Sequence, residues 1–561
     1  MKTELATLYT PFEKDLNTQK PWDVYPRPQF KRQSFINLNG KWDLEILRKA
    51  QSVFKGEIIV PFPLESRLSG VDFTKQTNDL LIYTKTINLN SNKNRIILNF
   101  GAVDQECKVY INGSLVGENL GGYLPFWFDI TNHLKEGENE IKVEVLDTLN
   151  LELAYGKQTK KRGGMWYTET SGIWQTVWLE EVPQNYIKDI KVTPSLTGFD
   201  ITVDGGDNLK TLTIDGKAHT FKGNNTKIEI ENPINWTPEN PHLYNFTLRC
   251  GEDEIQSYTA LRTVSIKGNK ILLNERPYFF HGLLDQGYFS DGIYTPATPS
   301  ALENDILKMK ECGFNMLRKH IKIEHELFYY YCDKLGMAVF QDLVNCGKYS
   351  FLIDTALPTI GLKKGVTHKA TPKRREQFIK NSKDTLSLLY NHPCVVYYTL
   401  FNEGWGQFDA KNLYKMMKNL DPTRVWDATS GWFQTGMSDV LSEHIYFKPL
   451  KFKPDNRPLV LSEFGGYSSK IKDHSFNKTK TYGYKFFSDN EEFKKALLKL
   501  YYDEVIPAIT AHGLCATVLT QVSDVEDETN GILTYDRQIL KVDPKEMCEM
   551  ATAIFEAYNN I

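Results

Sequence analysis

The first third of the chain alternates apolar and polar residues with the two-residue period of a β-strand. Residues 141–145 alternate Ile or Val with Lys or Glu, which predicts a strand with one face in water. Residues 109–113 form an apolar run that ends in Asn-Gly, a pair typical of a tight hairpin turn. Short strands separated by Gly, Asn and Asp continue in this way, so residues 1–183 are predicted to form a two-sheet β-sandwich.

A second all-β segment follows Pro183, where the first pattern breaks off. Residues 199–203 alternate apolar and polar side chains, and residues 244–248 do so again after two prolines. The segment is short and shows only the strand period. Residues 184–267 are therefore predicted to form a small immunoglobulin-like β-sandwich.

From Gly268 onward the pattern changes to strands that alternate with helices. One of these helices is expected to stop at Gly336, because glycine commonly ends a helix. The predicted strands are Tyr278–His281, Phe314–Arg318, Met337–Leu343, a run that ends at Glu403, Val425–Thr429, Glu443–Tyr446, Val460–Glu463 and Ala516–Gln521. Eight strands with intervening helices are typical of a closed parallel barrel, so residues 268–561 are predicted to form a (β/α)8 TIM barrel.

Two of the predicted barrel strands end in a glutamate. The run 395–400 is rich in β-branched and aromatic residues and leads into Glu403, which indicates a strand buried on both faces. The run 459–461 repeats the arrangement and leads into Glu463. The active site of such a barrel lies at the carboxyl ends of its strands, and glycosidases use two carboxyl groups. A single Asn-Glu after an apolar run is typical of a strand-to-helix cap, which is the alternative interpretation. The second glutamate, at the end of another strand, favours a catalytic role instead.

Composition and charge argue against several classes of protein. The formal net charge of −3 argues against a nucleic-acid or anionic-membrane partner. No apolar stretch approaches the ~18 residues of a membrane span, and the amino-terminal residues lack an apolar signal segment, which favours a cytoplasmic protein. The cysteines show no CxxC spacing and no nucleotide or flavin fingerprint stands out, so we expect no zinc site, disulfide framework or organic cofactor.

Short motifs extend along nearly the whole chain. They are Asn39–Trp42, Val60–Phe62, Tyr123–Phe126, Trp166–Trp174, Trp236–Tyr244, Gly313–Arg318, Cys332–Gly336, Asn391–Pro393 and Asn402-Glu403. In this order they resemble glycoside hydrolase family 2, which includes β-galactosidases, β-glucuronidases and β-mannosidases. The resemblance implies a jelly-roll sugar-binding domain, an immunoglobulin-like β-sandwich and a catalytic TIM barrel. It also implies a carbohydrate substrate and a homo-oligomer, either a dimer or a tetramer.

The same resemblance implies roles for individual residues. Glu403 would be the acid/base and Glu463 the nucleophile of a retaining exo-β-glycosidase. In relatives an arginine on strand two supports the nucleophile and an asparagine before the acid/base holds the 2-hydroxyl, and these residues correspond to Arg318 and Asn402. The strand-six tyrosine that contacts the nucleophile in relatives resembles Tyr446. Two alternatives stay open, which are a buried ion pair for Arg318 and packing at a strand end for Tyr446.

The chain departs from better-known members of the family near the predicted pocket. Asp285 follows strand one in place of the usual motif, and either binds a sugar hydroxyl or forms a turn. Lys319 and His320 follow strand two, and either contact an acidic sugar or pair with local carboxylates. Trp432 and His444 lie near strand ends, where they either line the sugar pocket or pack structurally.

These departures bear on the substrate. Residues 530–532 lack the Asn-x-Lys with which glucuronidases hold a uronate carboxylate, which argues against a β-glucuronidase and leaves other uronidases open. A neutral β-galactoside is our first expectation, and a β-hexuronide, either a glucuronide or a galacturonide, is the second. A catalytically inactive carbohydrate-binding protein is the alternative from another class; the presence of Glu403, Glu463 and Arg318 argues against it.

Overall fold

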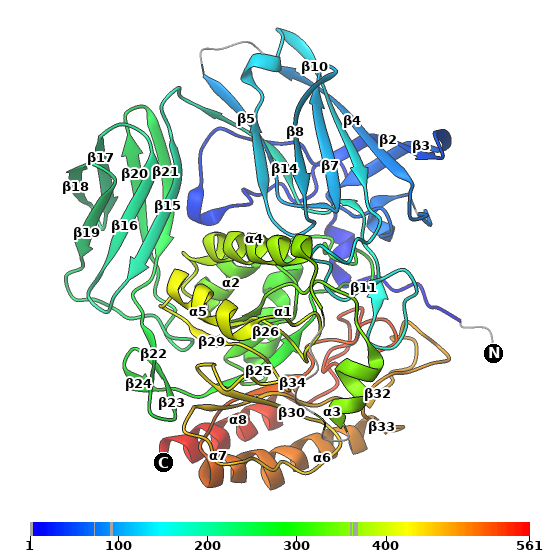
Figure 1. Cartoon of the computed structure of the whole chain (residues 1–561), viewed down its shortest axis with the longest axis vertical. Coiled ribbons are helices and arrows are strands. Elements are labelled where there is room, and N and C mark those ends of the chain that lie inside the picture. Colours follow the sequence, from blue (N-terminus) through cyan, green and yellow to red (C-terminus); the bar gives the residue numbers. More distant parts are fainter. Residues whose placement is uncertain (1–3, 72, 90–93, 360–361, 363–368) are drawn as a thin grey trace.

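The computed structural model describes residues 4–71, 73–89, 94–359, 362 and 369–561. Figure 1 shows two all-β domains, one blue to cyan and one teal to green, beside a domain in which helices surround a central sheet. In chain order these are a jelly-roll sandwich, an immunoglobulin-like sandwich and a TIM barrel, so the predicted fold class is confirmed. The segment considered for a signal peptide includes residues 1–3, which lie outside the described residues.

The first domain packs two antiparallel sheets against each other. Its six-stranded sheet has the order β3-β2-β4-β10-β7-β8, and the facing sheet has the order β1-β14-β5-β9. The strands are β1 (Phe35–Asn37), β2 (Gly40–Arg48), β3 (Gln51–Val60), β4 (Leu80–Leu89), β5 (Arg95–Phe100), β7 (Glu106–Ile111), β8 (Ser114–Leu120), β9 (Phe126–Asp129), β10 (Gly137–Leu146) and β14 (Val177–Val182). Alternate residues such as Leu98, Val109 and Val143 are fully buried between the sheets, because strand side chains point to opposite faces in turn.

The hairpin predicted at residues 109–113 is confirmed. Asn112 and Gly113 join β7 to β8 with φ angles of 50° and 80°. Both angles lie in the left-handed region, which the turn between two twisted strands requires and which Asn-Gly tolerates best.

The second domain is a smaller sandwich of seven named strands. One sheet has the order β15-β16-β19 and the other β18-β17-β20-β21. Their bounds are β15 (Ile187–Pro194), β16 (Gly198–Gly205), β17 (Leu209–Ile214), β18 (Lys217–Lys222), β19 (Asn225–Glu229), β20 (Tyr244–Cys250) and β21 (Asp253–Thr259). The residues predicted from the strand period to face inward, including Phe199, Ile201 and Leu248, form its core.

The third domain contains an eight-stranded parallel sheet that closes almost completely. Its order is β29-β28-β27-β26-β25-β34-β31-β30, and the ladder is interrupted between β29 and β30. The bounds are β25 (Phe280–Asp285), β26 (Met316–Lys319), β27 (Ala338–Asp342), β28 (Val395–Thr399), β29 (Val425–Asp427), β30 (Leu441–Ile445), β31 (Leu459–Gly465) and β34 (Leu514–Thr520). Most of these residues are buried, as expected for strands covered by helices on one side and packed side chains on the other.

The first barrel strand was predicted at the wrong residues. The prediction placed it at 278–281, whereas β25 begins at Phe280 and runs to Asp285. The residues before it belong to a hairpin, because β24 (Arg276–Pro277) pairs with β23 (Lys270–Leu273) and the Tyr278 amide donates to the Ile271 carbonyl. An aromatic run at the end of that hairpin looked like a strand of its own.

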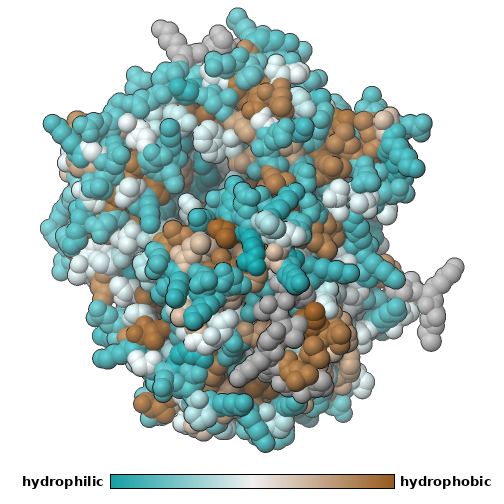
Figure 2. Space-filling view, viewed as in Figure 1, coloured by the Kyte–Doolittle hydropathy of each residue, from teal (hydrophilic) through white to brown (hydrophobic). Residues whose placement is uncertain are grey.

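Helices cover the outside of the barrel. They include α1 (Ser300–Glu311), α2 (Glu326–Leu335), α4 (Pro372–Leu389), α5 (Ala410–Leu420), α6 (Asn490–Leu500), α7 (Ile506–His512) and α8 (Pro544–Asn559). The stop predicted at Gly336 is confirmed, with φ 76° directly after α2. Figure 1 shows α4 beneath the first β-domain and beside the second, and Figure 2 shows the surface hollowed near the place where the three meet. Among the described residues, no helix has the length and apolarity needed to cross a membrane.

Candidate active site

Two carboxylates meet at the carboxyl end of the barrel. Glu403 follows β28, and Glu463 lies inside β31. One oxygen of each carboxylate and one nitrogen of His444 all lie within 4.8 Å of one another. Retaining glycosidases hold their carboxyl groups ~5–5.5 Å apart, whereas inverting enzymes leave ~6.5–9.5 Å for a water molecule. The structure therefore brings together the two glutamates at the strand ends, at a spacing that fits the retaining geometry.

The main chain of Glu403 is fixed in a left-handed conformation. Its φ is 54°, in a region that residues other than glycine seldom adopt. The Glu403 amide donates to the Ser430 carbonyl at 3.0 Å, and the Trp432 indole donates to the Glu403 carbonyl at 2.8 Å. Strain held by the surrounding structure in this way is typical of functional positions. Trp432 thus positions the backbone that carries one of the two carboxylates.

His444 lies between the two carboxylates. Its Nδ1 is 2.8 Å from Oε1 of Glu403 and 3.5 Å from Oε2 of Glu463. Its Nε2 is 2.7 Å from Oγ of Ser430. The side chain has no exposed area, so these contacts fix its ring. A proton on Nδ1 faces both carboxylates, and the imidazole links them electrostatically.

Arg318 connects three side chains beneath the pocket. Its guanidinium donates to Oε1 of Glu463 at 3.1 Å, to Oδ1 of Asp342 at 3.0 Å and to Oδ1 of Asn402 at 2.9 Å. Arg318 is almost fully buried. A buried ion pair and support of Glu463 were the two alternatives for Arg318. The structure contains both, because Arg318 pairs with Asp342 and with Glu463.

The surroundings of Glu463 favour its ionised form. Burial by itself would raise the pKa of this carboxyl group, but the charges of His444 and Arg318 outweigh it and lower the pKa to about 2. The Tyr446 hydroxyl also donates to Oε2 of Glu463 at 2.6 Å. Glu463 is therefore a carboxylate at neutral pH, as a nucleophile requires.

Lys319, His320 and Asp285 are engaged with protein groups. The Lys319 ammonium donates to Oδ2 of Asp285 at 2.7 Å and to Oε2 of Glu324 at 3.1 Å. His320 Nδ1 is 2.7 Å from Oδ2 of Asp342. The other Asp285 oxygen accepts from a main-chain amide two residues on, in a local turn. The sequence left two alternatives open for each of these residues. In the structure Lys319 and His320 pair with local carboxylates, and Asp285 forms a turn.

A loop of the first domain forms one wall of the barrel mouth. The ring of Trp166 lies 4.8 Å from that of Trp405 and 5.0 Å from that of Tyr349, in edge-on contacts. The Trp405 indole donates to the Tyr155 hydroxyl at 3.1 Å. Since Trp405 lies two residues after Glu403, the jelly-roll domain touches the segment that carries the carboxylate.

Three residues near the carboxylates were not identified from the sequence. Asp342 is the last residue of a buried strand. An acid at the end of an apolar run is the signal that marked the two glutamates, so the sequence could have revealed Asp342 as well. The ring of Tyr484 stacks on that of Tyr446 with centroids 3.8 Å apart. Glu528 accepts hydrogen bonds from the Tyr167 hydroxyl and the Gln521 amide. Tyr484 and Glu528 lie in irregular segments, where no period marks them.

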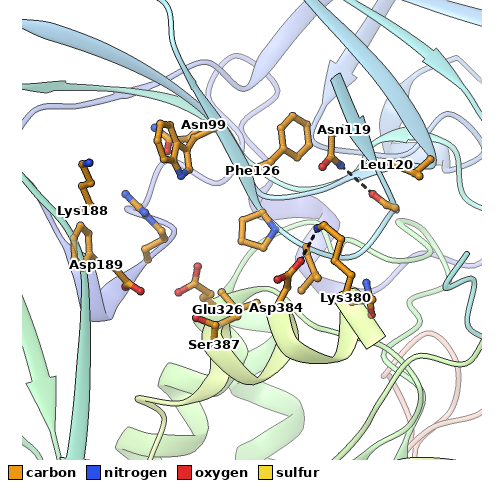
Figure 3. A pocket seen from close by; sticks show the side chains of 18 of the residues that line it. Asn99, Asn119, Leu120, Phe126, Lys188, Asp189, Glu326, Lys380, Asp384 and Ser387 are labelled. Atoms are coloured by element: carbon orange, nitrogen blue, oxygen red, sulfur yellow. Dashed lines mark hydrogen bonds and ion pairs between the residues drawn. The ribbon is translucent and has the colours of Figure 1, made fainter. Parts of the chain in front are cut away.

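A separate cleft of about 440 Å³ lies where α4 meets the two β-domains (Figure 3). None of the predicted site residues lines it. Lys380 and Asp384 form an ion pair across one helical turn, facing Asn119 (Figure 3). Burial raises the pKa of Glu326, on the same wall, to about 7. Among the described residues, no arginine or tyrosine donates a hydrogen bond to a carboxylate of this cleft, in contrast to Glu463. We therefore interpret the cleft as a polar crevice between domains.

The described residues offer one set of donors that could meet at a metal ion, and it is Glu403, His444 and Glu463. A cation at that point would lie beside the Arg318 guanidinium, which bonds directly to Glu463. Two like charges at such a distance repel, so the arrangement disfavours a metal.

The barrel, its accessory sandwiches and the carboxylate pair are the arrangement typical of glycoside hydrolases. A model described as the sugar binding domain of glycosyl hydrolases family 2 matches residues 27–183, and one described as the TIM barrel domain of that family matches residues 264–542. A model described as glycosyl hydrolases family 2 matches residues 185–262 between them. The chain belongs to glycoside hydrolase family 2.

Individual relatives are more distant. A β-galactosidase of Aeromonas hydrophila is 27% identical over 69% of this chain, which spans 41% of that relative's length. The structure of a β-D-glucuronidase of Dictyoglomus thermophilum is 19% identical, covers 96% of this chain and 99% of its own, and has a TM-score of 0.75. A β-galacturonidase of Eisenbergiella tayi is 18% identical over 96% and 98%, with a TM-score of 0.69. Because these two solved structures are only 19% and 18% identical to the chain, they show that the fold is similar and nothing more.

Proposed function

We propose that this chain is a retaining exo-β-glycosidase that removes terminal β-linked sugars. The observation that carries the proposal is the approach of Glu403 and Glu463 to within 4.8 Å at the carboxyl end of the barrel. Such a spacing leaves no room for a water molecule on the far side of the sugar, and it suits attack by a carboxylate instead. The wall formed by Trp166 supports an exo mode, since it closes one side of the mouth.

In this mechanism Glu463 attacks the anomeric carbon while Glu403 gives a proton to the departing glycosidic oxygen. A covalent glycosyl–enzyme forms, and the aglycone leaves as an alcohol. Glu403 then takes a proton from water, which attacks the same carbon and releases Glu463. Arg318 and the Tyr446 hydroxyl hold the nucleophile in place by two donated hydrogen bonds. Asn402 lies beside them, where it is proposed to hold the 2-hydroxyl.

The terminal sugar is proposed from two kinds of relative. The similar sequence named a β-galactosidase supports a neutral β-galactoside. The similar folds named a β-glucuronidase and a β-galacturonidase match almost the full length of their chains and support a β-hexuronide. Self-association into a dimer or a tetramer stays a prediction from the family.

The experiment is a panel of 4-nitrophenyl β-D-galactoside, glucoside, mannoside, glucuronide and galacturonide at one enzyme concentration. We expect at least one to be hydrolysed, and proton NMR of the first product to show the β-anomer. An α-anomer as first product would reject the retaining mechanism. If the protein binds these sugars and cleaves none, the inactive carbohydrate-binding alternative replaces the enzyme.

A further inference from the structure

Glu528 is a third carboxylate near the barrel mouth, and its position is fixed. It follows β34, the eighth barrel strand, and is 4% exposed. The Gln521 side-chain amide donates to Oε2 of Glu528 at 3.1 Å, and the Tyr167 hydroxyl donates to the same oxygen. Gln521 is held in turn, because its amide also donates to Oδ1 of Asn530 at 2.8 Å and its Oε1 accepts from Gln286 at 2.8 Å. The Glu528 carboxylate therefore has little freedom to move.

Two segments flank Glu528, and both contact the tyrosine that bonds to the proposed nucleophile. On one side Thr520 ends β34, and its Oγ1 lies 3.0 Å from the Tyr446 hydroxyl. On the other side the segment 482–484 pairs with Glu528 through a parallel bridge at its first residue, and the ring of its last residue stacks on Tyr446. The Tyr446 hydroxyl is 2.6 Å from Oε2 of Glu463. Glu528 thus lies on the side of the mouth that holds the nucleophile.

One oxygen of this carboxylate is a free acceptor. Among the residues that the structure describes, no donor bonds to Oε1 of Glu528 and no cation forms an ion pair with it, yet this oxygen is not fully enclosed by protein. Asp342 differs, because Arg318 and His320 bind one of its oxygens each. Buried polar groups in proteins are usually hydrogen-bonded, so Oε1 of Glu528 is available to a donor that enters the mouth.

The order of the strands places Glu528 across the barrel from Asn402. β28, which leads into Asn402, is second in the eight-stranded sheet, and β34, which leads into Glu528, is sixth. Strands four places apart in a closed barrel of eight face each other. In a pyranose ring the atom opposite C2 is C5, which carries C6. A sugar whose 2-hydroxyl meets Asn402 therefore directs its C6 group toward the side of Glu528.

We propose that Glu528 determines specificity at C6, because its free oxygen accepts a hydrogen bond from the 6-hydroxyl of a neutral β-hexoside and its charge repels a sugar with a carboxylate at C6. The proposal rests on the glycosidase function and on the role of Asn402 proposed above. Hydrogen bonds to an ionised acceptor are the stronger kind. Like charges brought together at a desolvated contact exclude the wrong ligand.

The repulsion depends on the ionisation of Glu528. Burial raises the pKa of this carboxyl group, whereas the charge of Lys157 and the hydrogen bonds from Tyr167 and Gln521 oppose the increase. The preference for neutral sugars should therefore be weakest in acid and grow as the pH rises through the pKa of Glu528. The ionisable groups around it are Lys157 and Tyr167 of the first domain, Glu463 of β31, and Tyr482 and Tyr484 after β32 (Tyr467–Ser469). The three tyrosines stay uncharged over this range, since burial raises the pKa of each.

The alternative is that Glu528 only ties Tyr167, and with it the jelly-roll domain, to the barrel. The two roles differ in their dependence on the substrate. A tie contributes to stability, and its loss affects every substrate equally. A residue that contacts the C6 group changes the ratio between substrates that differ only at C6.

The test uses 4-nitrophenyl glycosides that differ only at C6. They are the β-D-galactoside, the β-D-fucoside, which has a methyl group there, and the β-D-galacturonide; the glucoside and glucuronide form a second pair. Glu528→Gln keeps the shape and removes the charge, and Tyr167→Phe removes the tie. Glu526→Gln is the matched control, because this buried carboxylate on the same loop is bound by the Thr168 amide and Arg162.

We expect the wild type to have a higher kcat/KM for the neutral member of a pair, and this preference to increase with pH. Glu528→Gln should reduce the preference by about 10- to 100-fold, because a like charge at a desolvated contact weakens binding by factors of this size. It should also lower kcat/KM more for the galactoside than for the fucoside, which has no 6-hydroxyl. Glu526→Gln and Tyr167→Phe should keep most of the preference.

A preference that is the same in Glu528→Gln and the wild type would reject the proposal, and equal losses on all substrates with a lower Tm would establish the tie. A wild type that prefers uronides would also reject it, while the glycosidase function would stand. If Glu528→Gln does not fold, the wild-type pH series decides, and a preference that does not change with pH overturns the proposal. If no glycoside of either pair is cleaved, titration calorimetry with D-galactose, D-glucose and their uronates decides. Binding of neutral sugars alone, with uronate binding gained in Glu528→Gln, supports the proposal, and a wild type that binds uronates equally well or binds no sugar refutes it.

Discussion

The Nδ1 atom of His444 lies 2.8 Å from Oε1 of Glu403. The same nitrogen is 3.5 Å from Oε2 of Glu463. One imidazole therefore touches the proposed acid/base and faces the proposed nucleophile, although the three side chains come from three different strand ends. This link makes the ionisation of Glu463 depend on a residue that takes no part in bond formation.

Replacing His444 should change the pH dependence of the reaction. Apart from burial, His444 is the largest influence on the pKa of Glu463, and it lowers that pKa. In His444→Asn the pKa of Glu463 should therefore rise, and the acidic limb of kcat/KM should move to higher pH. Ser430→Ala is the control, because it removes the contact at Nε2 and leaves the imidazole in place. An acidic limb that stays in place in His444→Asn would show that the imidazole only fills space.

Glu403→Gln and Glu463→Gln should each reduce turnover strongly. Loss of a general acid–base group costs about 10²- to 10⁴-fold, and loss of a nucleophile removes the covalent route. The two variants should differ with an activated leaving group such as 2,4-dinitrophenol. Glycosylation by Glu403→Gln should then be largely restored, since the leaving group needs no proton, whereas Glu463→Gln should stay inactive.

Glu492→Gln on the exposed face of α6 is the matched control for these two variants. It should have wild-type turnover and stability, as surface substitutions usually do. Turnover by Glu403→Gln and Glu463→Gln equal to that of this control would refute the assignment of both carboxylates.

Acid should destabilise the fold partly through Glu463. Its pKa falls from an ordinary 4.5 to about 2 in the folded chain. The unfolded chain thus binds a proton first as the pH drops, and the unfolding free energy should decline from about pH 4.5 down to about pH 2. Urea unfolding over this range measures the decline. In Glu463→Gln the group no longer titrates, so the decline should be shallower; an identical slope would contradict the depressed pKa.

Trp166→Ala should weaken the wall of the barrel mouth. The ring packs against Trp405 and Tyr349, and truncation of a buried Trp costs ~3–5 kcal/mol. Because Trp166 is only half-buried, we expect a smaller loss of about 1–3 kcal/mol on the same scale and a raised KM. Trp127→Ala is the control, since that ring is 52% exposed. Equal changes in Tm and KM for both variants would show that the wall plays no part.

Local patterns determined much of the fold. The two-residue period predicted β10 and β16, and Asn112-Gly113 predicted the β7–β8 hairpin, because these signals act between neighbouring residues. Gly336 predicted the end of α2 for the same reason. The first barrel strand was misplaced because Tyr278 completes a hairpin with Ile271, a pairing that an apolar run does not reveal.

The sequence by itself determined that two buried strands end in glutamates, because a strand buried on both faces leaves a clear apolar run before the acid. It also indicated the order of the three domains. The tertiary structure decided which charges are paired. Lys319 lies beside Asp285 and Glu324, and Lys541 lies beside Asp524. Partners of buried charges depend on distances across the closed barrel and between domains, and chain order does not encode those distances.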